Sequence, residues 1–218
     1  MTDSSGFETL FESIATDLRV QGFSVQKQAL PQHLVDGLHG MVTELAPGSL
    51  RRAGVGRAGS LVANPEIRRD EIAWIEPTES TATPEGQWLE FAGQLQTYLN
   101  RRLLLGLFSF ESHFAHYAPG AFYKTHLDAF KGQANRVLSV VFYLNPQWGD
   151  DDGGEMVLYS DLNPDEEVCR VKPEAGTLAV FLSEDFPHEV LPARRDRYSI
   201  AGWYRVNSSS GSRVDPPA

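Results

Sequence analysis

Three stretches in the first half of the chain carry apolar residues at helical spacing. Residues 7–20 predict an amphipathic helix that ends at Gly22, and residues 22–25 predict a short strand directly after it. Pro31 opens a second helical stripe, and residues 87–105 carry a third and longer one. A helix with one apolar face has to bury that face, so the pattern predicts helices that pack against another layer.

Beyond Gly106 the pattern changes to short segments of strand character and keeps that character. Glycine, proline, asparagine and aspartate separate these segments at a spacing of roughly ten residues, which is typical of a sandwich or barrel. The expected strands cover residues 108–118, 121–127, 136–144, 155–159, 167–171, 177–182, 188–191 and 197–206. The predicted fold class is therefore α+β dominated by β, with N-terminal supporting helices before a jelly-roll of two facing sheets.

Two segments in the helical half depart from the helical pattern. Residues 47–65 are rich in glycine and arginine and predict a long mobile loop, and loops of this length are usually functional or disordered. The second half of residues 67–76 alternates as a strand does. We expect a single domain over residues 1–206, with helical support and a substrate loop in 1–105, a β core in 106–206, and a flexible tail in 207–218.

The composition favours a soluble globular protein, because 41% of the 218 residues are hydrophobic and 22% are charged. No apolar run is long enough to span a membrane, and the N-terminal stretch lacks the basic start of a secretory signal. The single cysteine, Cys169, excludes an internal disulfide, so the cytoplasm is the expected compartment. The net charge of -10 argues against a general nucleic-acid-binding surface.

His126 and Asp128 stand two positions apart at the end of an expected strand, and His188 opens a later one. Residues two apart on a strand point to the same face, so His126 and Asp128 are expected side by side. Two histidines and one carboxylate on one face of a metal, with open positions opposite, is the arrangement of non-heme Fe(II) oxygenases. The other interpretation is that both histidines are satisfied polar groups in a sandwich and Asp128 is a turn residue.

Arg197 follows His188 across a predicted turn, so it can face the same interior from the next strand. A guanidinium binds a carboxylate through two hydrogen bonds and keeps its charge when buried. An unpaired buried charge is costly, so a buried Arg197 implies an anionic partner. Ser199 lies two residues further on the same strand face and can add a hydroxyl. The alternative for Arg197 is an ordinary ion pair at a strand edge.

Two weaker signals are assigned structural roles. His113 and His116 are three residues apart and therefore point to opposite faces of a strand, which makes them poor chelating partners. The acidic run in residues 149–154 lacks the ligand spacing of a calcium loop and predicts a solvated turn.

The segment from Ile67 to Arg205 resembles the 2-oxoglutarate- and Fe(II)-dependent prolyl hydroxylases of the hypoxia-inducible-factor type. The bacterial members of that group, which act on elongation factor Tu, are the closer comparison because this chain is short. The matching pieces, in order, are Asp70–Glu76, Tyr117–Gly120, His126–Asp128, Tyr143–Asn145, Gly153–Glu155, His188–Val190 and Arg197–Tyr204.

The resemblance implies a double-stranded β-helix and an iron held by His126, Asp128 and His188. It also implies that 2-oxoglutarate binds the metal through its keto-acid end, with O2 as the second co-substrate and ascorbate as an additional cofactor. The residues that it places around the co-substrate or the target proline are Arg197 and Tyr143 at the far carboxylate, Tyr117 near the metal, and Trp203 in the proline pocket.

Asp70 and Arg136 match positions that lie at the substrate mouth in relatives. Attraction between these two charges would favour closure of a mobile segment, so residues 50–75 are expected to form a lid over the target peptide. Closing such a lid would exclude water from the reaction.

The resemblance implies 4-hydroxylation of a prolyl residue in a protein, with elongation factor Tu as the candidate target and succinate and CO2 as co-products. Three alternatives stay open from the residues alone. The same machinery could act on a free amino acid or small metabolite, or on a different protein residue. The chain could also be a binding module that responds to 2-oxoglutarate or O2 without turnover.

Overall fold

The structure is a computed structural model, and it describes residues 6–46, 48–54, 64–78, 80–129 and 135–207. Within these ranges the helices are α1 (Glu8–Gln21), α2 (Gln32–Thr43) and α3 (Pro84–Leu103), with a short 3-10 turn at Asp150–Asp152. The strands are β1 (Phe23–Gln26), β2 (Arg51–Arg52), β3 (Glu71–Trp74), β4 (Leu107–Tyr117), β5 (Tyr123–His126), β6 (Arg136–Tyr143), β7 (Met156–Tyr159), β8 (Glu167–Val171), β9 (Leu178–Leu182), β10 (His188–Val190) and β11 (Arg197–Val206). None of the helices in these ranges is long and apolar enough to cross a membrane.

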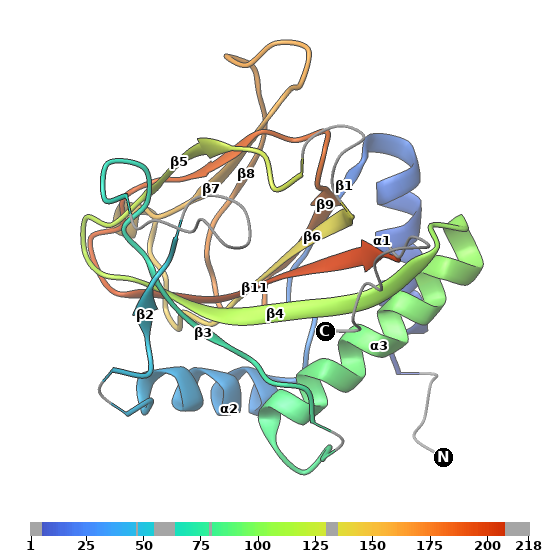
Figure 1. The fold of residues 1–218 in the computed structure, drawn as a ribbon, viewed down its shortest axis with the longest axis horizontal. Coiled ribbons are helices and arrows are strands. Elements are labelled where there is room, and N and C mark those ends of the chain that lie inside the picture. The colour runs from blue at the N-terminus through green and yellow to red at the C-terminus, as the bar shows by residue number, and fades with distance from the viewer. Residues whose placement is uncertain (1–5, 47, 55–63, 79, 130–134, 208–218) are drawn as a thin grey trace, which may run out of the picture.

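The strands form two antiparallel sheets (Figure 1). The major sheet, counted over the described residues, has seven strands in the order β1-β9-β6-β11-β4-β3-β2, and the minor sheet has four in the order β5-β10-β7-β8. The three helices lie along the major sheet, on the side away from the minor sheet (Figure 1). This arrangement confirms the predicted fold class, a β-dominated jelly-roll with supporting helices.

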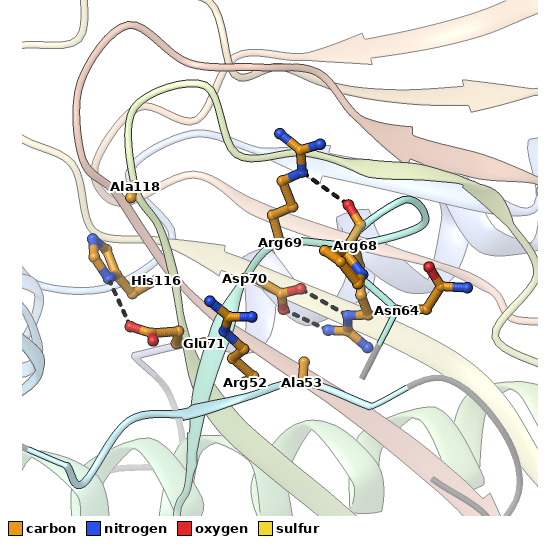
Figure 2. Close-up of a pocket in the computed structure, with 10 residues that line it drawn as sticks. Arg52, Ala53, Asn64, Arg68, Arg69, Asp70, Glu71, His116 and Ala118 are labelled. Atoms are coloured by element: carbon orange, nitrogen blue, oxygen red, sulfur yellow. Dashed lines mark hydrogen bonds and ion pairs between the residues drawn. The ribbon is translucent and has the colours of Figure 1, made fainter. Parts of the chain in front are cut away.

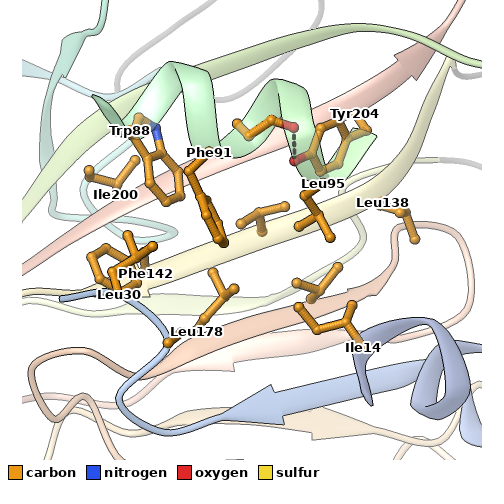
Figure 3. Close-up of a cluster of buried hydrophobic side chains, with 14 of the residues drawn as sticks. Ile14, Leu30, Trp88, Phe91, Leu95, Leu138, Phe142, Leu178, Ile200 and Tyr204 are labelled. Atoms are coloured by element: carbon orange, nitrogen blue, oxygen red, sulfur yellow. Dashed lines mark hydrogen bonds between the residues drawn. The ribbon is translucent and has the colours of Figure 1, made fainter. Parts of the chain in front are cut away.

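The main core lies between the helices and the major sheet (Figure 3). Trp88, Phe91 and Leu95 of α3 are buried there against Phe142 of β6 and Tyr204 of β11. Because side chains alternate along a strand, the other face of these same strands points toward the minor sheet. The residues of that inner face therefore become available for a site between the two sheets.

Sequence patterns located the β half of the molecule closely. The expected strands at residues 167–171 and 197–206 have the predicted bounds, and the others differ by one or two residues at an end. Helix α3 begins at Pro84, three residues before the predicted start, because Thr83 accepts a hydrogen bond from the backbone N–H of Gly86 and caps the helix.

The predicted loop over residues 47–65 contains a short strand that the pattern did not indicate. Arg51 and Arg52 pair with Ile72 and Glu71 of β3 and form the edge of the major sheet. A two-residue strand has no period to detect, which is why only its partner was predicted. The centre of the expected loop, residues 55–63, and the tail from residue 208 lie outside the described residues.

Candidate active site

His126, Asp128 and His188 form a cluster whose ligand atoms all lie within 4.8 Å of one another. Nε2 of His126 is 3.7 Å from Oδ1 of Asp128, and Nε2 of His188 is 3.6 Å from Oδ2 of the same carboxylate. Two imidazoles and one carboxylate directed at a common point are the donor set that suits a divalent iron ion.

The two histidines meet because they are register partners across the minor sheet. His188 is the first residue of β10 and pairs with His126, the last residue of β5. Asp128 reaches the cluster differently from the prediction, because β5 ends at His126 and Asp128 lies in the bend that follows. Strand alternation therefore does not set the direction of this carboxylate.

Backbone carbonyls orient both imidazole rings. Nδ1 of His126 is 2.8 Å from the carbonyl oxygen of Lys124, and Nδ1 of His188 is 3.0 Å from that of Phe186. A carbonyl can only accept, so each Nδ1 carries the proton and each Nε2 keeps its lone pair. This is the tautomer that a metal ligand needs, and both lone pairs point toward Asp128.

The electrostatics of the cluster favour a charged Asp128 carboxylate next to a neutral His126 imidazole. Burial by itself would raise the pKa of Asp128, but the neighbouring His188 and His126 and the hydroxyl of Ser139 hold that pKa below its usual range. Burial and the neighbouring His188 lower the pKa of His126. Neutral histidine and ionised aspartate are the protonation states that bind a divalent cation.

Arg197 supplies a buried positive charge elsewhere in the same interior. It opens β11, is 1% exposed, and donates from Nε to the carbonyl oxygen of Gly154 at 2.8 Å. Nη1 lies 3.4 Å from Oγ of Ser199, and the guanidinium packs 4.8 Å from the ring centre of Tyr117 and 5.1 Å from that of Tyr143. Within the described part of the chain this guanidinium contacts only neutral groups, so its charge remains available for an anion.

Tyr143 adds a donor next to this guanidinium. Its hydroxyl is buried and makes no hydrogen bond within the described part of the chain. Burial raises the pKa of Tyr143 to about 12, although the nearby Arg197 opposes that shift. A buried unpartnered hydroxyl is costly unless a ligand satisfies it. A carboxylate placed between Tyr143 and Arg197 would accept from both, so these residues fit the far end of 2-oxoglutarate.

The metal cluster and the anion site open into one interior because β6 contributes to both. Ser139 donates from Oγ to Oδ2 of Asp128 at 2.7 Å, and Tyr143 stands further along the same strand face. Tyr143 pairs with Ser199 of β11, and Arg197 is the first residue of that strand, two positions before Ser199. Tyr143 therefore lies beside Arg197.

Trp203 and Arg136 lie together at the metal end. Cζ of Arg136 is 3.7 Å from the centre of the Trp203 ring, and Nη2 of Arg136 donates to Glu111 at 2.7 Å. The buried indole N–H of Trp203 has no partner in hydrogen-bonding geometry within the described residues, and it contributes to lowering the pKa of Asp128. Two of the three side chains predicted to contact substrate, Arg136 and Trp203, are therefore brought together near the candidate ligands.

Asp70 has a different ion partner from the one predicted. It is 1% exposed and accepts two hydrogen bonds from Arg68, at 2.7 Å and 2.5 Å, so its charge is compensated within its own segment. Arg136 pairs with Glu111 instead, and the expected attraction between Asp70 and Arg136 is wrong for this structure. The reason is proximity along the chain, because Arg68 stands two residues before Asp70.

A pocket of about 400 Å³ is lined in part by this ion pair. Figure 2 shows the paired Arg68 and Asp70 together with Arg52, Arg69 and Glu71, which also line it. Arg68 also contacts the ring of Tyr123, which lies against His126 of the metal cluster.

Sequence reasoning gave no role to Tyr123, although it stands next to the candidate ligands. Its ring stacks on His126 with centroids 3.5 Å apart and planes 15° from parallel. Cζ of Arg68 lies 4.2 Å from the same ring, so Tyr123 connects the pocket to the metal cluster. Ser139 was also missed, and its signal was a serine within the run of apolar residues that follows Arg136 in β6.

His113 is predicted to make the stability of the protein depend on pH. Its ring is buried between Trp74 and Trp203, and burial lowers its pKa to about 4. The unfolded chain binds this proton near pH 6.5, so between about pH 6.5 and pH 4 it holds more protons than the folded chain. Stability is therefore lost as the pH falls through that window, by about 3 kcal/mol.

The measurement compares the unfolding free energy of the wild type with that of His113→Phe between pH 7 and pH 4. Phenylalanine keeps a ring between Trp74 and Trp203 but cannot take up a proton. The difference in unfolding free energy between the two proteins should shrink or reverse toward low pH. Only the wild type loses stability there, because protons bind its unfolded state more tightly at this side chain. A pH-independent difference would contradict the prediction.

Known proteins with similar sequences are iron oxygenases, as expected for a cluster of His126, Asp128 and His188. The model of the family described as the 2OG-Fe(II) oxygenase superfamily matches residues 112–205, which contain the three candidate ligands and Arg197. A crystal structure of a Pseudomonas putida prolyl-4-hydroxylase is 39% identical, with a TM-score of 0.79, covering 90% of this chain and 99% of that one. The chain belongs to the 2OG-Fe(II) oxygenase superfamily. The oxygenase therefore uses Fe(II), 2-oxoglutarate and O2, as the residues predicted.

Two further proteins are similar to this oxygenase, one from a solved structure and one from the human proteins. A Trichoplax adhaerens prolyl hydroxylase, in complex with a hypoxia inducible factor peptide fragment, is 27% identical with a TM-score of 0.78 over 92% of this chain and 91% of its own. Human Egl nine homolog 1 is 27% identical over 146 residues, which are 64% of this chain and 33% of that protein. The oxygenase thus matches only about a third of the human relative's length.

Proposed function

We propose that this oxygenase is a prolyl 4-hydroxylase that acts on a prolyl residue of a protein. The observation that carries the proposal is the cluster of His126, Asp128 and His188 in a chain that aligns over 90% of its length with a prolyl-4-hydroxylase. The candidate substrate is elongation factor Tu, because the chain is similar to the bacterial hydroxylases that act on it. A cytoplasmic location goes with this proposal.

In this proposal His126, Asp128 and His188 hold Fe(II) and leave one side of the metal free for its co-substrates. Together, bound iron and 2-oxoglutarate supply the oxygen chemistry, which yields succinate, CO2 and a hydroxylated proline. The protein contributes the direction of the ligands, since the carbonyl oxygens of Lys124 and Phe186 hold both imidazoles with Nε2 toward the metal.

Arg197 anchors the far carboxylate of 2-oxoglutarate, with Tyr143 donating its hydroxyl to the same group. Ser199 supports the guanidinium through its hydroxyl, and Tyr117 packs along the guanidinium and keeps this end of the interior dry. Charge-assisted hydrogen bonds in a buried site fix the co-substrate in one orientation, which determines where its keto-acid end meets the metal.

Trp203 and Arg136 form the wall that the target proline contacts. Pyrrolidine packs favourably on an aromatic face, and Arg136 holds the Trp203 ring in place from one side. The pocket around Asp70 supports a substrate that extends beyond one amino acid, because it offers about 400 Å³ beside the metal cluster, with Arg68 in its lining and Tyr123 between Arg68 and His126. These features favour a peptide over free proline.

The test incubates the purified protein with Fe(II), 2-oxoglutarate, ascorbate and elongation factor Tu. The expected result is a mass gain of one oxygen atom on a single prolyl residue, located by fragmentation, with an equal amount of succinate. The same incubation without 2-oxoglutarate should leave elongation factor Tu unchanged.

Other outcomes separate the alternatives. Modification of free proline alone would overturn the protein-substrate part of the proposal. Succinate formed with a different protein would keep the enzyme and reject elongation factor Tu. If Fe(II) and 2-oxoglutarate bind but no succinate forms with any prolyl substrate, the protein is a binding module and the proposal of an enzyme is rejected.

A further inference from the structure

Asp128 is held by a different part of the fold from the two histidines of the cluster. His126 and His188 pair with each other inside the minor sheet, so the hydrogen bonds of that sheet fix their separation. Asp128 lies in the bend after β5, where no strand pairing restrains it. Its carboxylate instead receives a hydrogen bond from Ser139 of β6, which belongs to the major sheet.

Behind Ser139 stands a second hydroxyl. Oγ of Ser139 lies 2.7 Å from Oδ2 of Asp128, and Oγ of Ser183 lies 2.9 Å from Oγ of Ser139. A carboxylate only accepts, so the single hydroxyl proton of Ser139 is directed at Asp128. Ser183 must then donate to Ser139, which gives a directed line from Ser183 through Ser139 to the carboxylate.

Both serines stand in the rigid interior of the molecule. Ser139 is 2% exposed and Ser183 is 0% exposed, and the backbone N–H of Ser183 donates to the carbonyl oxygen of Val137 at 3.0 Å. Hydrogen bonds in series strengthen one another, more so in a low-dielectric interior. The line therefore ties the bend that carries Asp128 to two central strands of the opposite sheet, β6 and the end of β9.

We propose that Ser139, supported by Ser183, is the positioning residue for the carboxylate ligand of the metal. Its hydrogen bond takes up a lone pair of Oδ2, the oxygen on the side of His188, and leaves Oδ1 on the side of His126 without a competing donor, so that Oδ1 is the oxygen offered to the metal. Coordination by a single oxygen keeps positions open for the co-substrates. This inference rests on the proposed function, specifically on Asp128 as a ligand.

The experiment titrates the full chain with Co(II), as a spectroscopic substitute for iron, and records the dissociation constant and the visible absorption bands. Ser139→Ala should weaken Co(II) binding by about 10-fold or more, within the range for loss of an outer-shell partner. It should also change the visible bands, because a freed carboxylate can bind through both oxygens. Ser183→Ala should weaken binding less, and Ser139→Thr should restore both readouts by returning the hydroxyl.

Ser112→Ala is the matched control, since Ser112 is a buried serine of the major sheet whose hydroxyl accepts from Trp88 at 3.1 Å. It should cost stability without changing Co(II) affinity. If Asp128→Ala binds Co(II) as tightly as the wild type, the proposed ligand set fails. If Asp128→Ala binds weakly while Ser139→Ala matches Ser112→Ala in affinity and bands, the ligand set stands and the role of Ser139 is overturned. Should Ser139→Ala fail to fold, Ser183→Ala decides on the same readouts.

Discussion

His126→Ala is expected to abolish turnover and to weaken Fe(II) binding by at least about 100-fold, because even the loss of an outer-shell partner costs 10–100-fold. The substitution removes one of three candidate ligands and leaves His188 and Asp128, whose nearest atoms are 3.6 Å apart. Two remaining donors cannot hold the metal in one orientation. Equilibrium dialysis with metal analysis measures the affinity, and succinate formation measures the turnover.

His33→Ala provides the control for this prediction, because His33 is an exposed histidine on α2. It should leave both iron affinity and succinate formation unchanged. The folding of His126→Ala can be checked by its melting temperature without added metal, which should fall only modestly, because the half-buried imidazole loses its stacking contact with Tyr123 but fills no core position. Wild-type iron affinity in His126→Ala would disprove the ligand assignment.

The fold was largely predictable because its signals are local. Each strand of the β half is a short apolar or alternating run between turn residues, and each helix has one apolar stripe. What the pattern could not give was the pairing order of the sheets, since β11 lies between β6 and β4 although it is last in the chain. Strand order depends on contacts between distant residues, which no periodicity encodes.

The site was predictable where residue type alone is informative. Two histidines, an aspartate and an arginine on expected strands that face one interior have few other uses together, so His126, His188 and Arg197 could be singled out before the fold was known. Asp128 was placed in the cluster for a reason that the structure corrects, because a bend and a hydrogen bond from Ser139 set its direction.

Partners of charged residues were harder to predict. Asp70 was expected to attract Arg136, but an arginine two positions away satisfies it through two hydrogen bonds. Arg136 in turn finds Glu111 across the sheet. Several partners of equal charge compete for each carboxylate, and only the packing of β3 and β4 decides between them.

Arg197→Leu is expected to weaken 2-oxoglutarate binding by about 100-fold or more. Two hydrogen bonds to a charged group are lost, each worth about 1.5–3 kcal/mol, and every 1.4 kcal/mol is a factor of ten. Fe(II) affinity measured without 2-oxoglutarate should stay near the wild-type value, because Arg197 contacts Gly154, Ser199 and two tyrosine rings and none of the candidate ligands. Calorimetric titration with 2-oxoglutarate on the metal-loaded protein, and with metal on the free protein, separates the two affinities.

Tyr143→Phe gives a sharper version of the same experiment, because Arg197 also holds Gly154 and its loss could disturb the fold. The buried Tyr143 hydroxyl has no hydrogen-bond partner among the residues that the structure describes, so replacing it by hydrogen should leave the stability of the ligand-free protein unchanged or slightly raised. Affinity for 2-oxoglutarate should nevertheless fall by about 10-fold, since the co-substrate loses one hydrogen bond to a charged oxygen. A drop in stability together with unchanged co-substrate affinity would show that Tyr143 serves the core and that the carboxylate binds elsewhere.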